Sequence, residues 1–374
     1  MPQYGPIPAE IAIIGDYPDR SGDGYSRVAA LLSKLGITST SCYFSTLTET
    51  APPLTKGQPE IDHWISERKT CPGAGWVHHQ GKWFHPTLAA GAKSVEARLA
   101  EVAPKLVITL GKAPLAWLAG PTGIAKWRGS RLTPADKPYT LLPTLHPRTL
   151  LNQPEQSFIL TLDIKRAYNI YTHKQLPRLY NFTIAPTLDQ VLERLTELFA
   201  TAEALRTSGS SEKLKLSGDL ETRAANIACF GIAWSAEDAI CIPHLVINDD
   251  NPFYWSLEDE AQIVWLYAQL FHHPNILWIG QNYLYDTQYF WRHWGFLPIH
   301  VRDTMIAHHS LHSNIRKGLD FLSSMYAQDH VYWKEEIKDW NPKLGEKQFW
   351  EYNCKDACIT YEIDAEIIKE RERE

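Results

Sequence analysis

Three short apolar runs, each ending at or just before a glycine or proline, most constrain the fold of the first half of the chain. Residues 11–15 (IAIIG), 105–110 (KLVITL) and 139–143 (YTLLP) have the length and composition of buried strands. Between them, residues 26–35 and 88–102 place apolar side chains at helical spacing. Strands that alternate with helices predict an α/β/α domain whose central sheet is parallel and whose loops gather at the carboxyl ends of the strands.

The second half predicts a different α/β arrangement, with a mixed sheet and helices. A long amphipathic helix is expected first. Two apolar segments on either side of residues 235–238 then predict an antiparallel hairpin. The expected helices cover residues 186–206 and 257–271, and the expected strands cover 213–220, 227–234, 239–245 and 276–279. The segment 46–87, which contains several Pro, Gly and Trp residues, predicts irregular structure. We therefore expect two domains, residues 1–170 and 171–374, with the boundary between 165 and 185.

Charge separates the same two halves. Residues 1–170 contain 18 Lys and Arg against 13 Asp and Glu, a net +5, whereas the remainder contains 19 against 30, a net −11. No apolar run approaches the ~20 residues of a membrane span, so no membrane association is expected. Six cysteines without a CxxC pair exclude a disulfide scaffold and favour a reducing cytosol.

Acidic side chains in the second half recur at spacings that bring them onto shared faces. Asp219 and Glu221 are two apart on an expected strand, so both point to one side of the sheet. Tyr352 and Asp356 are four apart on an expected helix, which also places them on one face. Any one of these acids alone is most often a solvated surface charge. As an ordered set, together with Asp286, they predict a site for hard cations, which prefer oxygen ligands.

Three motifs, GDLET, NYLYD and YNCKD, resemble those of the DEDD exonuclease superfamily, in the subgroup with tyrosine before the last aspartate. The segments 302–311 and 318–326 are similar to the proofreading domains of family A DNA polymerases. The resemblance implies a ribonuclease H-like (DnaQ-like) fold and hydrolysis of phosphodiesters with two divalent cations, Mg²⁺ or Mn²⁺. It assigns the metal ligands and catalytic groups to Asp219, Glu221, Asp286, Tyr352 and Asp356, and substrate contacts to Asn282, Leu220 and Thr222.

Segments of the first half resemble the uracil-DNA glycosylase superfamily, especially its family-4-like branch. They are IAIIGDYPD, KLVITLGKAPLAWLAG, WRGSRL and LPTLHPRTLL. The resemblance implies that Asp16 and His146 lie at the site of base excision. However, Asp19 replaces a usual glycine, and CYFSTL (42–47) lacks the asparagine that reads the uracil edge in many members. The cysteines of an iron–sulfur cluster are also missing, so no such cluster is expected.

Two interpretations of this first domain stay open. It is either a working glycosylase with a variant pocket, or a glycosylase-like fold retained to bind DNA or a partner, which we favour. Basic residues near the expected loop ends could contact DNA phosphates. They are Lys112, Lys126, Arg128, Arg131 and Arg148.

The whole chain resembles the front part of a bacteriophage-type family A DNA polymerase. We expect a 3′–5′ exodeoxyribonuclease that acts in proofreading on single-stranded 3′ ends and mispaired primer termini, in the bacterial host cytoplasm if the protein is from a phage. Nothing resembles a polymerase palm or fingers, so the polymerase would lie in a longer form of this chain or in a separate chain. The alternatives are an RNA-trimming exonuclease of the same superfamily and a DNA-binding or polymerase-docking module. His308, His309 and His312, and likewise Cys354 and Cys358, favour packing over metal binding.

Overall fold

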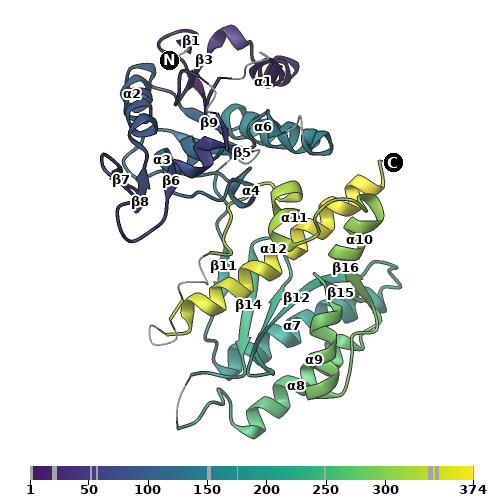
Figure 1. Ribbon diagram of the computed structural model, residues 1–374. Coiled ribbons are helices and arrows are strands. Elements are labelled where there is room, and N and C mark those ends of the chain that lie inside the picture. Colours follow the sequence, from purple (N-terminus) through teal and green to yellow (C-terminus); the bar gives the residue numbers. More distant parts are fainter. Residues whose placement is uncertain are drawn as a thin grey trace. The chain divides into compact units, whose positions relative to one another are not determined.

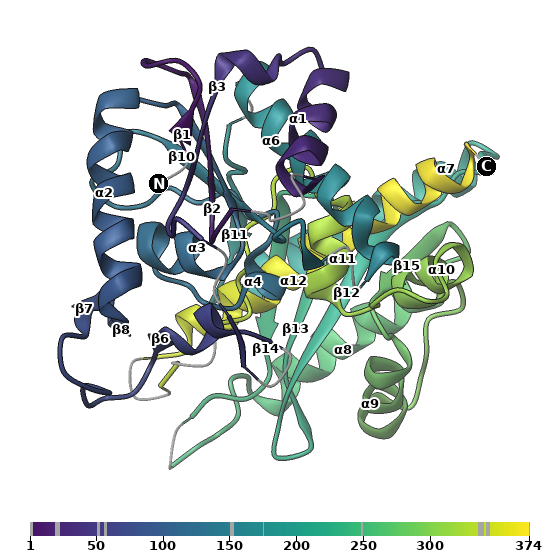
Figure 2. The same ribbon diagram turned by 45° about the horizontal axis from the view of Figure 1, so that its top comes forward.

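The computed structural model divides the chain into two compact units (Figures 1 and 2). Unit 1 comprises Met1–Pro177 together with Gln328–Tyr332, and unit 2 comprises Arg178–Ala327 and Trp333–Glu374. The division at Pro177 falls between the expected limits of 165 and 185. The structure describes residues 3–18, 23–50, 53–55, 58–149, 153–174, 176–247, 250–335, 340–341 and 345–373.

Unit 1 is built on a five-stranded sheet in the order β1-β3-β2-β9-β10. The last four strands in this order run parallel, and β1 pairs antiparallel with β3 at the edge. The strands are β1 (Gln3–Tyr4), β2 (Ile11–Gly15), β3 (Cys42–Thr46), β9 (Leu106–Leu110) and β10 (Thr140–Thr144). The three strands expected from the apolar runs are confirmed, and the parallel sheet with them.

Helices cover both faces of this sheet, which makes a three-layer α/β/α domain (Figure 1). Two of them pack on one face, α2 (Pro86–Val102) and α3 (Lys112–Ala119). The other face is covered by α1 (Asp23–Lys34) and α6 (Ser157–Thr172). The short α4 (Ile124–Trp127) precedes β10.

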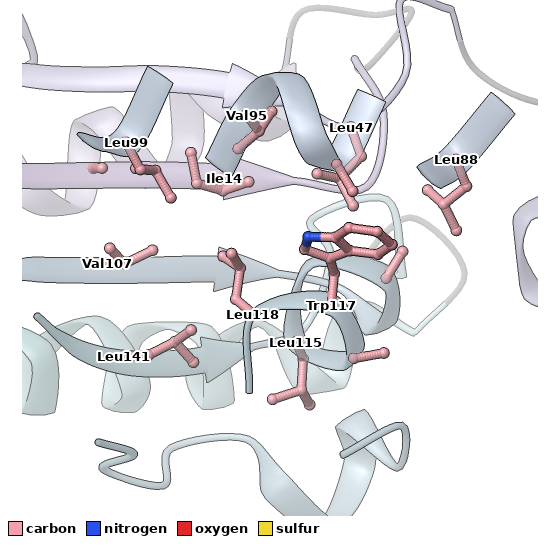
Figure 3. Packing of buried hydrophobic residues seen from close by; sticks show 14 of the residues in the cluster. Ile14, Leu47, Leu88, Val95, Leu99, Val107, Leu115, Trp117, Leu118 and Leu141 are labelled. Carbon is pink, nitrogen blue, oxygen red and sulfur yellow. The ribbon is translucent and has the colours of Figure 1, made fainter. Parts of the chain in front are cut away.

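Alternation along β2 explains why both faces are apolar. Ile11 and Ile13 belong to the core under α1 and α6, whereas Ala12 and Ile14 belong to the core under α2 and α3. A strand buried on both sides needs apolar residues at every position, because successive side chains point to opposite faces. Figure 3 shows the second of these cores, with the Trp117 indole among side chains of α2, α3 and the sheet.

The segment CYFSTL, which lacks the asparagine that reads the uracil edge in many glycosylases, contains the strand β3, whose five residues are all buried. One expectation for unit 1 is wrong. The expected irregular region contains short strands instead. They are β4 (Leu54–Thr55) and β5 (Gln58–Pro59), which pair with each other, and β6 (Ile65–Ser66), β7 (Val77–His79) and β8 (Lys82–Phe84), which form a three-stranded antiparallel sheet.

Unit 2 contains a six-stranded mixed sheet in the order β11-β14-β13-β12-β15-β16. β12 is central: it pairs antiparallel with β13 and parallel with β15. The strands are β11 (Asn181–Thr183), β12 (Leu214–Arg223), β13 (Asn226–Ala233), β14 (Asp238–Pro243), β15 (Ile276–Gly280) and β16 (Val301–Asp303). The expected hairpin of β13 and β14 and the mixed sheet are confirmed.

The two faces of this sheet carry different side chains. On one face, large residues such as Phe230 and Trp278 pack against α7 (Leu188–Thr207), α8 (Leu257–Phe271) and α9 (Leu284–Trp294). On the other face, small residues such as Ala228 and Ala239 allow the 25-residue α12 (Lys347–Arg371) to lie close to the strands. The helices α10 (Thr304–Leu311) and α11 (Leu319–Tyr326) contact α12. Across the described parts of the chain, no helix has the length and apolar character needed to cross a bilayer.

Arg128 and Arg131, expected to contact DNA phosphates, lie inside unit 1. Arg128 is 2% exposed; its Nε donates to Asp163 Oδ2 at 2.9 Å and its Nη2 donates to Oδ1 of the same carboxylate. Thr144 Oγ1 donates to Asp163 Oδ2 at 2.6 Å. Arg131 is 7% exposed and pairs with Asp329 at 3.0 Å. Both guanidinium groups are buried and pair with carboxylates inside the unit, so they are not placed to contact DNA phosphates as expected.

Replacement of Arg128 by methionine should destabilise the protein by about 3–5 kcal/mol, because it leaves the buried Asp163 carboxylate without its cation. The matched control is Arg98→Met, since the Arg98–Glu101 pair is partly exposed on α2 and should contribute less than about 1 kcal/mol. Urea denaturation followed by circular dichroism gives both values. Equal losses in the two variants would show that burial of the Arg128 pair has no special weight.

Candidate active site

Strand β12 places Asp219 and Glu221 on the face of the sheet that α12 covers, with Leu220 turned into the opposite core. The register with β13 shifts between Glu221 and Thr222, a bulge of the kind that redirects side chains next to functional sites. Gly231 lies opposite Asp219, and a Cβ there would come within 2.5 Å of Asn353 Oδ1. The glycine therefore makes room for a side chain of α12 beside Asp219.

Helix α12 brings three residues to this face of the sheet, Tyr352, Asn353 and Asp356. Asn353 Nδ2 donates to the Asp219 carbonyl oxygen at 2.9 Å and to Asp219 Oδ2 at 2.8 Å. Tyr352 and Asp356 both accept a hydrogen bond from the Lys334 ammonium, which agrees with their predicted place on one helix face. Carboxylate oxygens of Asp219, Glu221 and Asp356 lie within 4.8 Å of one another. The fold thus gathers three of the four expected acids into one group, which we call the carboxylate group.

Asp286 stands apart from the carboxylate group but is tied to the same strand. It lies in the first turn of α9, is 5% exposed, and accepts a hydrogen bond at 2.9 Å from the backbone N–H of Leu220. The turn before it is held by Asp303, which accepts from the N–H groups of Asn282 and Tyr283 at 3.0 and 2.8 Å. The backbone of Asn282 has φ 55°, a left-handed conformation that asparagine tolerates better than most residues.

Crowding of these acids in a protein environment disfavours their ionised forms. Burial, followed by the charges of the other three carboxylates, raises the pKa of Asp219 well above its ordinary value. Burial and then the charge of Asp356 raise the pKa of Glu221 to about 8. Burial also raises the pKa of Asp286 to about 7, although hydrogen bonds from backbone N–H groups oppose the rise. The site therefore favours the binding of positive charge.

Two residues that the motifs did not indicate hold the last acid of the group. Trp333 Nε1 donates to Asp356 Oδ1 at 2.6 Å, and Lys334 Nζ donates to Asp356 Oδ2 at 2.5 Å. Lys334 Nζ also donates to the Tyr352 hydroxyl at 2.6 Å. Both residues lie in an irregular segment after α11, where no periodicity or spacing relates them to a helix face. Only the tertiary path of that segment brings them to Asp356.

The carboxylate group fits a hard divalent cation. Its donors are all carboxylate oxygens, they lie within 4.8 Å of one another, and their mutual repulsion is relieved when a cation binds between them. Within the described ranges, no second cluster of three or more His, Cys, Asp or Glu side chains has comparable geometry. His308, Cys354 and Cys358 are fully buried, and the two cysteines belong to the core under α12.

The three residues expected to contact substrate lie in different environments. Leu220 is 5% exposed and belongs to the core under α7 and α8, so its side chain is not placed for substrate contact. Thr222 is half-buried and its Oγ1 lies 3.0 Å from the Tyr285 hydroxyl. Asn282 is exposed at the left-handed turn. Tyr285, which the motif analysis did not assign, therefore lies beside Thr222 at the start of α9.

In unit 1, Asp16 is committed to the fold. It is 6% exposed, and its Oδ1 accepts a hydrogen bond at 2.7 Å from the N–H of Ala113, in the first turn of α3. A carboxylate at a helix N-terminus is stabilised by the free N–H groups there. A Cβ at Gly111, whose φ is 104°, would come within 1.9 Å of Asp16 Oδ2. The glycine and the aspartate together shape this turn.

His146 is also buried, at 6% exposure, and its ring stacks on Tyr17 at 4.5 Å. Arg148 is half-buried, with its guanidinium 5.9 Å from the centre of the Tyr17 ring. Lys112 and Lys126 are half-buried as well. Asp19, the other departure expected to affect DNA binding, lies outside the described residues. His146, Arg148 and Tyr17 thus form a small cluster beyond the carboxyl ends of the strands.

Comparison with known families agrees with the two units. Residues 191–372 match a family model described as 3′–5′ exonuclease, and residues 2–170 match the model of the uracil DNA glycosylase superfamily. Both matches confirm the architecture inferred from the motifs. No curated protein matches the chain.

Solved structures similar to the chain include three nucleases. The catalytic core of RRP6 from Trypanosoma brucei aligns with a TM-score of 0.37 and 15% identity, over 51% of this chain and 48% of that one. RNase D of Escherichia coli, an exoribonuclease involved in structured RNA processing, gives 0.36 and 17%, over 52% and 46%. NrnC of Brucella melitensis with bound Mg²⁺ gives 0.34 and 14%, over 53% and 83%. The chain spans about half the length of the first two, and likenesses this distant do not bear on its substrate.

Stability without metal should fall as the pH rises, and Glu221→Gln should remove part of this fall. The folded-state pKa of Glu221 is about 8 against an ordinary value of 4.5, so the folded state retains a proton that the unfolded state loses across this window. Below about pH 4.5, Glu221 is neutral in both the folded and the unfolded state. Above it, the unfolded state ionises first, so the stability that the retained proton provides is lost as the pH rises through about 8. The glutamine variant cannot ionise, so its melting temperature should exceed that of the wild type most at the alkaline end.

Thermal melts in EDTA between about pH 5 and about pH 8.5 test this dependence. Glu212→Gln, at an exposed position in the loop before β12, is the control and should follow the wild type at every pH. A constant offset between Glu221→Gln and the wild type would mean that ionisation of Glu221 does not affect stability.

Proposed function

We propose that this chain, which joins a uracil DNA glycosylase-superfamily domain to a 3′–5′ exonuclease domain, is a divalent-cation-dependent 3′–5′ exodeoxyribonuclease. The observation that carries the proposal is the carboxylate group, in which oxygens of Asp219, Glu221 and Asp356 lie within 4.8 Å with Tyr352 on the same helix face. Four acids in this order on a strand, a helix start and a second helix supply the oxygen donors for two-metal hydrolysis of a phosphodiester.

Each residue has a role that follows from its position. Asp219, Glu221 and Asp356 would hold the cations, and Asp286 would support the second one from its place beside the β12 backbone. Bound cations would lower the pKa of a water ligand and stabilise the negative charge on the leaving 3′ oxygen. Burial, and then the charge of Asp356, raise the pKa of Tyr352 above its ordinary value. Its hydroxyl therefore stays protonated and orients the attacking water rather than acting as a base.

DNA is the proposed substrate because the first domain matches a superfamily described by its action on DNA. A polymerase, in a longer form of this chain or in a separate one, would supply mispaired 3′ termini for proofreading. Trimming of RNA by the same carboxylates is the outcome that would redirect the proposal, since the 2′-hydroxyl distinguishes the two substrates.

The full chain should remove nucleotides from the 3′ end of labelled single-stranded DNA in Mg²⁺ or Mn²⁺. Excess EDTA and the double change Asp219→Ala/Glu221→Ala should each abolish the activity, because both leave the site without metal. Denaturing gels with 5′-labelled DNA, a mispaired primer and an RNA of the same sequence measure the preference. Faster degradation of RNA would exclude the DNA-specific function, and activity that survives the double change would exclude this site.

Tyr352→Phe should reduce kcat by about 10²-fold, whereas Asp356→Ala should reduce it by about 10⁴-fold or more. Phenylalanine keeps the ring of α12 and loses one hydrogen bond, while the alanine removes a metal ligand. Single-turnover rates at saturating metal compare the two. An equal loss in both would indicate that the Tyr352 hydroxyl has a role as large as a metal ligand.

Unit 1 should not excise uracil at a useful rate, although it is expected to bind DNA. Asp16 accepts a hydrogen bond from the first turn of α3, and the segment 42–47 lacks the asparagine that reads the uracil edge in many members of the superfamily. The assay incubates the full chain with a uracil-containing duplex in EDTA, so that the exonuclease is silent, and then cleaves abasic sites with alkali. Strand breaks that disappear in Asp16→Asn would establish a working glycosylase.

A further inference from the structure

Lys334 is the one cation seen to pair with the carboxylate group among the described residues. Its Nζ lies 2.5 Å from Asp356 Oδ2 and 2.6 Å from the Tyr352 hydroxyl, and 4.8 Å from the centre of the Tyr352 ring. Its charge also favours the ionised forms of Asp219 and Glu221. The ammonium is therefore located where a divalent cation would have its strongest attraction.

The neighbouring Trp333 binds the same carboxylate differently. The indole is fully buried and donates to Asp356 Oδ1, whereas the Lys334 side chain is 26% exposed and takes Oδ2. A neutral indole does not compete electrostatically with a metal, and it can hold Asp356 in place while the lysine leaves. The flexible four-carbon stem and partial exposure of Lys334 give its ammonium a route to solvent.

We propose that Lys334 is a built-in counter-ion of the carboxylate group, and that a divalent cation binds by taking Asp356 Oδ2 from it. This inference rests on the proposed function, because it assumes that the carboxylate group is a metal site. The lysine stabilises the metal-free fold, since three carboxylates within 4.8 Å would otherwise repel one another without compensation. The same contact lowers the affinity for metal, because the cation has to displace a bound ammonium before it gains that oxygen.

Two opposite effects of one substitution follow. Lys334→Gln keeps a side-chain amide that can donate to Asp356 or Tyr352 but removes the positive charge. In EDTA, the variant should melt at a lower temperature than the wild type. With metal, it should bind more tightly, by about tenfold or more, because a unit charge a few ångströms from the ligands is removed.

Isothermal titration of the full, EDTA-stripped chain with Mn²⁺ alone near neutral pH measures this affinity without any nuclease assay. Lys334→Arg keeps the charge and should stay within about threefold of the wild type. Lys347→Gln is the matched control: it removes the same charge from the first turn of α12, at a lysine that is 75% exposed and pairs with Glu351. Its Mn²⁺ affinity should equal that of the wild type.

Lys334→Gln with unchanged or weaker Mn²⁺ affinity would overturn the counter-ion role, as would an equal gain in Lys347→Gln. If Lys334→Gln does not fold in EDTA, Lys334→Arg still decides, because a guanidinium variant that binds Mn²⁺ about tenfold more tightly than the wild type contradicts displacement of a charge. Absence of Mn²⁺ binding in the wild type and every variant would instead refute the metal site and, with it, the proposed function.

Discussion

Repulsion between carboxylates that the fold holds close together is the constraint on which the arrangement of unit 2 depends. Asp219 and Glu221 come from β12 and Asp356 from α12, with oxygens within 4.8 Å. Such a group is costly in a folded protein unless positive charge compensates it. The surrounding structure supplies that compensation and fixes the geometry. Lys334 provides positive charge, Trp333 donates a hydrogen bond to Asp356, and Asn353 donates one to Asp219.

Small residues make this closeness possible. The face of β13 and β14 under α12 carries alanine, cysteine and glycine, so the helix can approach the sheet near enough for its side chains to reach Asp219. Gly231 is the sharpest case, because any Cβ there would collide with the amide of Asn353. On the opposite face, large aromatic side chains such as Phe230 and Trp278 pack in the same core as Leu220 of β12. The packing of the sheet therefore determines how close the carboxylates of β12 and α12 lie.

In unit 1, several charged residues that the motifs indicated for binding hold the internal structure together instead. Arg128 and Asp163 form a buried pair, and Asp16 binds the first turn of a helix. These are positions where sequence motifs suggested contacts with DNA or with a flipped base. A charged side chain near a strand end can point to solvent or inward, and local sequence does not distinguish the two, because the partner that makes burial favourable lies far away in the chain. Asp163 is 35 residues from Arg128.

The sequence by itself determined the strands with apolar runs, the two domains and the motif acids, because periodicity of two or of 3.6 residues decides which side chains share a face. Asp219 with Glu221, and Tyr352 with Asp356, could be paired on that basis alone. The tertiary structure decided what depends on distant contacts: the burial of β3, the inward turn of Leu220, and the approach of Trp333 and Lys334 to Asp356. Those two residues lie in an irregular segment, and an irregular backbone has no period from which the direction of a side chain can be predicted.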